Sequence, residues 1–422
     1  MNVDTERLRG DIEENAEFGR ISTDEGRGRT VLTGTEPNRE AREYLVQRLE
    51  DAGLGVRIDA VGNIAGRWTP ESADPEAAPV TAGSHLDSVP EGGIFDGPLG
   101  VYAALEAVRA MQDAGVEPDR PVEVVSFTEE EGQRFASGLL GSSVAVGERT
   151  VEEALALEAE GPEGDTVTLE SALEGIGFRG EGLLDAGEWD SWLELHVEQS
   201  ERLEDADVPV GVVTAITGIT HCEATVRGEA DHAGATPMGD RTDALTAASE
   251  FVLDVERAAN EVVEESSDTA VGTVGSLDVR PNATNVVPGA VEMGVDIRDV
   301  DRESMETIAS RARDSLARLE RERGVSTDFS RPFDLEPTPM SDRVRQSAHD
   351  AGEDAGIETM DLHSGAAHDT MHVAEKTDAG LLFAPSRDGI SHNPKEWTDW
   401  DDCATATRVL AGALANLAGA AT

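Results

Sequence analysis

The pattern of apolar and polar residues in the first third of the chain predicts helices that alternate with strands. Residues 36–52 carry apolar side chains at helical spacing, and Pro98 opens a second helix that Gly115 closes. Short apolar runs predict strands at residues 56–58, 81–83 and 122–127. Strands that alternate with helices indicate an α/β sheet, and ligands of such sheets bind beyond the carboxyl ends of the strands.

The middle of the chain has a different order of elements. From about residue 216 the pattern predicts a strand, a helix, two strands, a helix and a strand, at residues 216–227, 243–264, 270–279, 291–298, 303–323 and 325–329. This β-α-β-β-α-β order is typical of a ferredoxin-like domain. Apolar and polar residues alternate from Val291 onward, so Arg298 should project from the face that the helices leave uncovered.

The return to α/β patterning after the insert predicts two domains. The first is an α/β domain made of residues 1–211 and 330–422, and the second is the insert, residues 212–329. The α/β domain ends in a helix predicted at about residues 403–418.

Acidic residues greatly outnumber basic ones, with 86 Asp and Glu against 34 Lys and Arg, so the net charge is −52. Such a surface does not suit nucleic acid or anionic lipid, and we expect neither nucleic acid nor a membrane as a partner. The acids are spread along the chain, and Lys376 and Lys395 are the only lysines. We interpret this distribution as a halophilic adaptation of the whole surface, and a cation-capturing protein is the alternative.

The cysteines and the N-terminal residues favour an intracellular location. Cys222 and Cys403 lie far apart and provide neither a disulfide framework nor a thiolate metal site. The first residues are charged and contain no apolar signal segment, and no apolar run approaches the ~18 residues that span a bilayer. We therefore expect a cytoplasmic protein.

A glycine-rich segment after the second predicted strand carries candidate metal ligands. In GSHLDSVPEGGIFDGPLG, residues 83–100, His85 and Asp87 follow the strand, and Asp96 lies in a glycine-flanked turn before the helix. Imidazole and carboxylate groups bind divalent zinc or manganese. A His-X-Asp sequence alone is also compatible with a solvated turn whose aspartate caps the next helix.

Three consecutive glutamates follow the next strand, in SFTEEEGQRF, residues 126–135. Such a run is most often a solvated surface. Metal-assisted hydrolysis, however, needs one carboxylate on the metal and a free neighbour that takes a proton from the metal-bound water.

Two further segments contain isolated histidines. His196 lies in LELHVEQSERLE, residues 193–204, and His392 in GISHNPKEWT, residues 389–398. Each histidine alone is more often structural than metal-binding. Only nine histidines occur in the chain, and His85, His196 and His392 each lie in a segment rich in glycine or carboxylates, which favours a shared metal site.

These four segments, in this order, resemble the M20 metallopeptidase clan, and within it the amidase/hydantoinase/carbamoylase branch. That branch contains N-carbamoyl-L-amino-acid hydrolases, allantoate amidohydrolases and β-ureidopropionases. The similarity extends from DAVGN (59–63) to about residue 400. Further segments typical of the branch are EEGQRFASGLLGS (130–142), LELHVEQ (193–199), ADHAGATPM (230–238) and SGAAHD (364–369). The resemblance implies a dinuclear metallohydrolase domain with an inserted dimerisation domain.

The resemblance implies two divalent ions per subunit, Zn or Mn, with Co or Ni also possible, bridged by Asp96. It assigns His85 and His196 to one ion, and Glu131 and His392 to the other.

Three residues are implied as catalytic. Glu130 is the general base, because the carboxylate pair of the family stands directly before Gly132. Asp87 orients the ring of His85. His232, in ADHAGATPM, reaches the active site of the partner subunit in a homodimer and stabilises the oxyanion.

Four residues are implied in substrate binding. Asn285 and Arg298 would bind a substrate carboxylate, and Gln199 and His368 would line the site. A turn asparagine and a sheet-edge arginine are the alternatives for the first two. The family commonly has Gly-Pro where this chain has Ser200–Glu201, which leaves the substrate contacts at this position open.

The function implied is hydrolysis of the C–N bond of an N-carbamoyl-L-amino acid or a related ureido acid, such as allantoate or β-ureidopropionate. An aminoacylase or peptidase of the same clan is one alternative. A non-catalytic metal- or ligand-binding protein is another, but every expected ligand and the base are present.

Overall fold

The structure is a computed structural model, and it describes residues 1–135, 138–161 and 164–420. Ala136 and Ser137, which belong to the quoted segment EEGQRFASGLLGS, lie outside the described residues. No helix among the described residues combines the length and the apolar character needed to cross a membrane.

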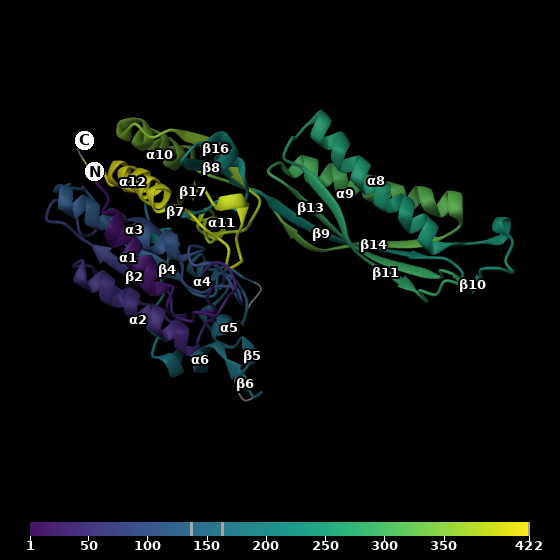
Figure 1. Cartoon of the computed structure of the whole chain (residues 1–422), viewed down its shortest axis with the longest axis horizontal. Helices are drawn as coiled ribbons and strands as arrows, with labels where there is room; N and C mark the ends of the chain where they lie inside the picture. The colour runs from purple at the N-terminus through teal and green to yellow at the C-terminus, as the bar shows by residue number, and fades with distance from the viewer. Residues whose placement is uncertain (136–137, 162–163, 421–422) are drawn as a thin grey trace. The chain divides into compact units, whose positions relative to one another are not determined.

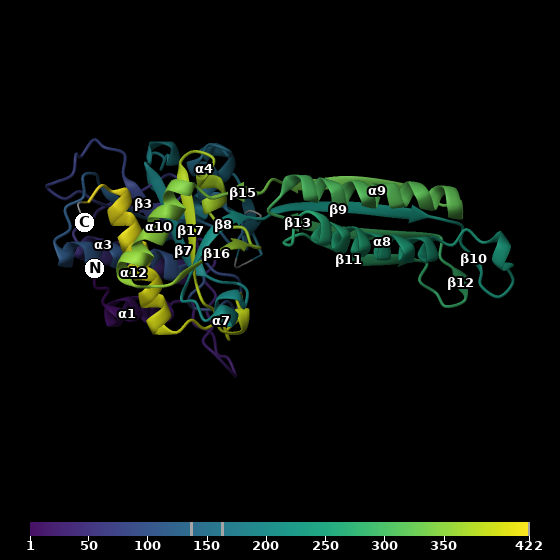
Figure 2. The same cartoon turned by 90° about the horizontal axis from the view of Figure 1, so that it is seen from above.

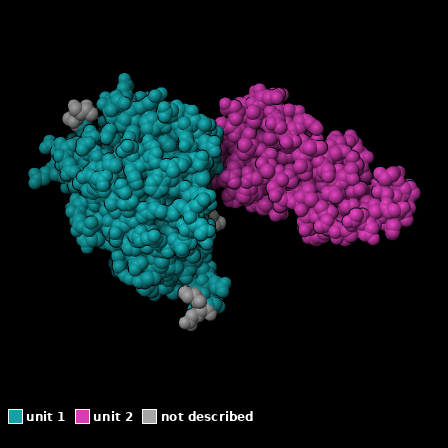
Figure 3. All heavy atoms as spheres, in the orientation of Figure 1, with its two compact units in different colours: residues 1–214, 340–422 teal, residues 215–339 magenta. Residues whose placement is uncertain are grey.

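The chain forms two compact units, coloured separately in Figure 3. Unit 1 combines residues 1–214 with residues 340–422, and unit 2 contains residues 215–339. Unit 2 ends later than residue 329, the end of the predicted insert. Its last long strand, β14 (Ser326–Leu335), continues beyond Phe329, where the sequence pattern predicted its end.

A nine-stranded mixed sheet runs through unit 1 (Figure 1). Its strands in spatial order are β1 (Gly55–Ile58), β2 (Ile64–Trp68), β4 (Val122–Phe127), β3 (Val80–His85), β7 (Ser191–Val197), β17 (Asp378–Ala384), β8 (Val210–Ile216) and β15 (Thr338–Pro339), with β16 (Thr359–Ser364) paired to β8. The neighbours β4, β3, β7 and β17 are parallel, so their carboxyl ends lie at one edge of the sheet.

Apolar side chains cover both faces of this sheet. Val124 of β4 packs in the larger core, whereas the adjacent Val125 packs in a second core with Phe127 and Trp192. This pattern is expected for buried parallel strands with helices on both sides. The helices of unit 1 are α1 (Thr5–Asn15), α2 (Glu36–Asp51), α3 (Pro98–Ala114), α4 (Leu140–Ala145), α5 (Val151–Leu155), α6 (Leu169–Ile176), α7 (Arg202–Ala206), α10 (Asp342–Ala355), α11 (Thr370–Val373) and α12 (Trp400–Leu417), and a short hairpin joins β5 (Glu158–Glu160) to β6 (Thr166–Thr168).

The predicted α/β pattern of unit 1 is confirmed. Helix α3 and strand β4 have the predicted bounds, and α2 differs from the prediction by one residue. Gly115 ends α3 in the left-handed conformation, with φ +65°, which a glycine adopts without steric cost.

Unit 2 is a four-stranded antiparallel sheet with two helices on one face (Figure 2). Its main elements are β9 (Gly218–Arg227), α8 (Ala244–Glu265), β11 (Val271–Arg280), β13 (Ala290–Asp299), α9 (Arg302–Arg323) and β14, and the sheet order is β11-β13-β9-β14. The predicted β-α-β-β-α-β order is confirmed. Val291 and Val295 are buried against the helices, so Arg298 lies on the opposite face, as the alternation predicted.

Candidate metal centre

The carboxyl ends of four parallel strands bring the four candidate segments to one edge of the sheet. His85 is the last residue of β3, and His196 is the last but one of β7. The Glu129–Glu131 loop follows β4, and the loop with His392 follows β17. These strands are adjacent and parallel, so side chains that are far apart in the sequence meet at this edge.

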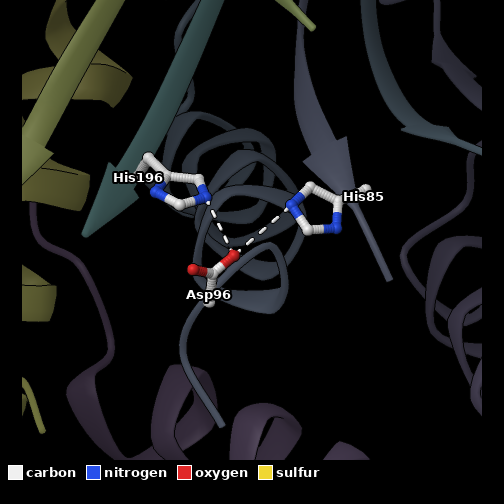
Figure 4. Close-up of side chains that lie close together, drawn as sticks. All are labelled: His85, Asp96 and His196. Carbon is white, nitrogen blue, oxygen red and sulfur yellow. Dashed lines mark ion pairs between the residues drawn. The ribbon is translucent and has the colours of Figure 1, made fainter. Parts of the chain in front are cut away.

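Asp96 belongs to two of the clusters of possible ligands at this edge, and Figure 4 shows it facing His85 and His196. Its Oδ1 atom is 3.6 Å from Nε2 of His85 and 3.3 Å from Nε2 of His196. Its Oδ2 atom is 3.5 Å from Nε2 of His392, and the same nitrogen is 3.3 Å from Oε2 of Glu131. The two oxygen atoms of Asp96 therefore face two different sets of donor atoms, and all five residues predicted as ligands lie together.

Backbone carbonyl groups orient both buried histidine rings. Nδ1 of His85 is 3.1 Å from the carbonyl oxygen of Asp87, and Nδ1 of His196 is 3.1 Å from that of Val197. An Nδ1–H that donates to a carbonyl leaves Nε2 free to bind a cation. Gly97, with φ +82°, allows the approach, because a Cβ atom there would lie 2.6 Å from the ring of His85.

The three consecutive glutamates point in different directions. Glu129, with φ +57°, is buried, and its carboxylate accepts the N–H groups of Arg134 and Phe135 at 2.6 and 2.8 Å. Glu130 instead places Oε2 3.6 Å from Nε2 of His85, and Glu131 faces His392. The second and third glutamates therefore contribute to the site, whereas the first folds back onto its own loop.

Asp87 lies beside the ring of His85, as predicted for a residue that orients it, but its carboxylate makes shorter contacts with a neighbouring loop. Its carboxylate is 3.8 Å from Nδ1 of His85, farther than its backbone carbonyl. The carboxylate accepts the N–H groups of Glu130 at 3.3 Å and of Glu131 at 3.1 Å. Asp87 thus ties the loop after β3 to the loop after β4 and holds the two carboxylate-bearing residues in place.

Buried negative charge accumulates at this edge of the sheet. Burial raises the pKa of Glu131 to about 9, and repulsion by Asp96 and Asp87 acts in the same direction. Burial, followed by repulsion from Glu131, also raises the pKa of Glu130 well above its usual value. Groups with raised pKa values next to one another favour the binding of a cation, which removes the repulsion.

The two buried histidines among the predicted metal ligands have opposite protonation states. Burial lowers the pKa of His85 to about 4, so its ring is neutral. Burial acts in the same direction on His196, but the attraction of Asp96 and of Glu194 outweighs it and raises the pKa to about 10. In the metal-free protein, His196 is therefore a cation paired with Asp96.

Two residues predicted to line the site lie beside it. Nε2 of Gln199 donates to Oδ2 of Asp96 at 3.4 Å and to Oγ of Ser391 at 3.3 Å. His368 is buried, and its ring meets that of His196 edge-on, with the ring centroids 4.7 Å apart. Both side chains limit the space next to the ligand atoms.

Two polar residues of the site were not identified from the sequence. Oγ of Ser391 donates to Oδ2 of Asp96 at 2.6 Å. Asp369 is fully buried, and burial raises its pKa well above the usual value. Ser391 directly precedes His392, and Asp369 directly follows His368. Their positions next to predicted histidines could have identified them from the sequence.

The other predicted residues, His232, Asn285 and Arg298, belong to unit 2. His232 lies on β10 (Asp231–His232), which pairs with β12 (Val286–Val287), and the carbonyl of Asn285 accepts the N–H of Ala233 at 3.0 Å. Nδ1 of His232 accepts the N–H groups of Gly234 and Ala235. Because Nδ1 accepts, the exposed ring has Nε2–H available as a donor.

Arg298 lies at the other end of the sheet of unit 2 from His232 and Asn285. Asn285 precedes the start of β13 at Ala290, and Arg298 is near the end of that strand. At ~3.3 Å per residue, the strand separates the two positions by about 25 Å. One copy of unit 2 therefore cannot bring Arg298 and Asn285 to the same small molecule.

Comparisons with known proteins match the chain over most of its length. A model of peptidase family M20/M25/M40 matches residues 81–416. Two N-carbamoyl-L-amino-acid amidohydrolases are each 39% identical to this chain. The match with the protein of Paenarthrobacter aurescens covers 97% of each chain. The match with the protein of Geobacillus stearothermophilus covers 93% of this chain and 94% of the relative.

A solved structure shows the same relationship in three dimensions. It is an amidase of the hydantoinase/carbamoylase family from Burkholderia multivorans, 35% identical, with a TM-score of 0.90 and coverage of 99% of this chain and 98% of that one. The resemblance that the four sequence segments indicated is thereby confirmed. The chain belongs to peptidase family M20/M25/M40 and, within it, to the hydantoinase/carbamoylase amidases.

Proposed function

We propose that the protein is a metal-dependent amidohydrolase that cleaves the C–N bond of an N-carbamoyl-L-amino acid or a related ureido acid. The observation that carries this proposal is the arrangement around Asp96. Two sets of nitrogen and oxygen donors share its carboxylate, and the carboxylate of Glu130 lies beside them. The names of the 39% identical relatives support the carbamoyl substrate class.

The donor groups fit two divalent ions. His85 and His196 with Asp96 form one set, and Glu131 and His392 with Asp96 form the other, with the ligand atoms of each set within 4.8 Å of one another. Imidazole and carboxylate donors suit Zn or Mn, and Co or Ni are also accepted. When bound, such ions polarise the scissile carbonyl and lower the pKa of water.

Glu130 is the proposed general base. Its carboxylate lies next to the ligand atoms, with Oε2 3.6 Å from Nε2 of His85. This position allows the carboxylate to accept a proton from the attacking water and pass it to the leaving nitrogen. Asp87 and its hydrogen bonds to the N–H groups of Glu130 and Glu131 keep the base oriented.

We propose that each substrate is bound by unit 2 residues that come from two different copies of the chain. Arg298 would hold the substrate carboxylate with its two-pronged guanidinium. His232 would donate its Nε2–H to the oxyanion, and Asn285 would bind nearby. Because about 25 Å of strand separates Arg298 from Asn285, two copies are needed, and this supports a homodimer.

An exposed sheet edge offers a surface for such a homodimer. Strand β11 is an edge strand, and its Val271 and Leu277 are exposed. The neighbouring helix α8 exposes Leu253 and Val263. Edge strands with exposed apolar side chains pair readily with a second chain.

The acidic composition supports halophilic adaptation of the enzyme, and we propose separately that it is cytoplasmic. The test is steady-state kinetics above about 1 M KCl and at ~0.1 M KCl, with chelated protein and each metal added back. N-carbamoyl-L-amino acids, allantoate and β-ureidopropionate form one substrate panel, and dipeptides and N-acyl amino acids form the second. Turnover confined to the second panel would identify a peptidase or aminoacylase, and no turnover in either would indicate a binding protein. Undiminished folding and activity at ~0.1 M KCl would exclude halophilic adaptation.

A further inference from the structure

Two buried residues with ionisable side chains, Arg29 and Glu396, hold the loop that carries Asp96 through hydrogen bonds to its backbone. We propose that both are positioning residues, which fix the carboxylate of Asp96 between the two sets of ligand atoms. They act through the backbone of residues 92–96. This inference rests on the proposed function in so far as Asp96 is expected to bind both ions.

Glu396 binds the backbone at Asp96 directly. Its Oε1 atom accepts the N–H of Phe95 at 2.8 Å and the N–H of Asp96 at 3.0 Å, and the residue is only 1% exposed. Gly93 permits this approach, because a Cβ atom there would lie 2.3 Å from Oε1 of Glu396. A carboxylate that accepts two adjacent N–H groups defines the direction of the peptide planes, and so the direction in which the Asp96 side chain leaves the loop.

Arg29 binds the same loop two residues earlier. Its backbone N–H donates to the carbonyl of Gly92 at 3.0 Å, its Nε donates to the carbonyl of Gly93 at 3.3 Å, and its side chain is fully buried. Its Nη1 and Nη2 atoms, and Oε2 of Glu396, have no hydrogen-bond partner within the part of the chain that the structure describes. Burial lowers the pKa of Arg29, and the attraction of Glu396 is the largest effect that opposes this shift.

The hairpin that carries Arg29 also contacts the loop of Glu396. The N–H of Arg27 donates to the carbonyl of Pro394 at 2.7 Å, and Gly26, with φ +78°, lies so close that a Cβ atom would be 1.9 Å from that carbonyl oxygen. On its other side, Oγ1 of Thr30 accepts the N–H of Glu91 at 2.9 Å. Residues 19–31 therefore brace two ligand-bearing loops against each other, and they precede the region that the family model matches.

The consequence for the site follows from the position of Asp96. Each of its oxygens faces different ligand nitrogens, so a small rotation of its loop changes both sets of distances at once. Residues that orient metal ligands without contacting the metal typically contribute 10- to 100-fold to metal affinity or activity. We expect effects of about that size when the contacts of Glu396 or Arg29 are removed.

The first test uses the metal-free protein and hydrogen–deuterium exchange of peptides that cover residues 92–98. Glu396→Ala removes the Oε1 atom that accepts both N–H groups, and the N–H groups of Phe95 and Asp96 should exchange at least about tenfold faster. Glu396→Gln keeps an acceptor oxygen and should restore most of the protection. Arg109→Met is the matched control, because it removes another buried arginine, paired with Asp11, and should leave exchange at residues 92–98 unchanged.

The second test is the visible absorption spectrum and the chelation rate of the Co²⁺-substituted protein. Glu396→Ala and Arg29→Met should change the cobalt bands and speed metal loss by about 10- to 100-fold, whereas Arg109→Met should change neither. Unchanged exchange at residues 92–98 together with an unchanged cobalt spectrum in both variants would overturn the proposal. If wild-type protein binds no cobalt, the proposed function fails, whereas the exchange measurement still decides the role of Glu396.

Discussion

The guanidinium of Arg298 forms a two-pronged contact with the carboxylate of Asp296 on the same strand. Nε donates to Oδ1 at 3.0 Å, and Nη2 donates to Oδ2 at 3.1 Å. Asp296 also lies 3.1 Å from Nε2 of His221. The guanidinium of Arg298 is thus already arranged for a two-pronged contact with a carboxylate, which is the geometry that the proposed binding of a substrate carboxylate requires.

We predict that Arg298→Lys raises KM for a carbamoyl-amino acid by about tenfold or more, because lysine cannot form the two-pronged contact. The value of kcat should change much less, since the carboxylate is remote from the reacting carbonyl. Steady-state kinetics measures both constants. Asp296→Asn is the control: it weakens the competing contact and should leave KM unchanged or lower it. An unchanged KM in Arg298→Lys would exclude Arg298 from carboxylate binding.

Glu130→Gln should lower kcat by at least about 100-fold, because an amide cannot take the proton of the attacking water. The metal content should stay at the wild-type level, as measured by mass spectrometry of the metals. Glu129→Gln is the matched neighbour, since its side chain accepts the N–H groups of Arg134 and Phe135, and a glutamine oxygen can also accept them. If Glu129→Gln is inactive and Glu130→Gln is active, the general base is Glu129 and not Glu130.

Chelation should remove the two ions at different rates. The side chain of His392 is 50% exposed, whereas those of His196 and His85 are 3% and 1% exposed. The ion at His392 should therefore leave first, and His392→Ala should eliminate the fast phase of metal loss. Asp96→Asn should weaken metal binding in both phases, because each oxygen of Asp96 faces a different set of ligand atoms. A single phase in the wild type would contradict two distinct sites.

Metal uptake should release protons and strengthen as the pH rises. Glu131 has a pKa of about 9 in the metal-free protein, so its carboxyl is protonated at pH 7 and must lose that proton to bind a cation. His196, with a pKa of about 10, must also lose one. Affinity should therefore increase up to about pH 9–10 and then level off. Calorimetry in buffers of different ionisation enthalpy counts the protons, and zero release at pH 7 would refute this account.

His232 should act on the active site of the partner subunit. His232→Ala should lower kcat with little change in metal content, because the residue lies in unit 2 and the predicted ligands lie in unit 1. Mixing inactive His232→Ala protein with inactive Glu130→Gln protein should restore about one quarter of the wild-type rate after subunit exchange, since half of the dimers then contain one complete site. No recovery, despite mixed dimers in native mass spectrometry, would place His232 in its own subunit.

The α/β alternation and the order of elements in the insert could be predicted from the sequence, because periodicity of apolar residues reports burial on one face of a helix or strand. Helix α3 illustrates this: Pro98 and Gly115 mark both ends by local backbone preferences. The types of ligand were equally accessible, since imidazole and carboxylate groups follow strand ends in four segments. These features depend on neighbouring residues, and the sequence contains them directly.

Other features were decided only by the tertiary structure. The family motif predicted that Glu130 and Glu131, and not Glu129, belong to the site, but the physical reason is tertiary: the positive φ of Glu129 and its hydrogen bonds from Arg134 and Phe135 turn its side chain away. The pairing of Glu396 with the backbone of Asp96 joins positions 300 residues apart. Such contacts depend on sheet order and loop packing, because these determine which distant side chains share a buried space. The sequence by itself therefore determined the elements and the chemistry available, and the tertiary structure decided which atoms face one another.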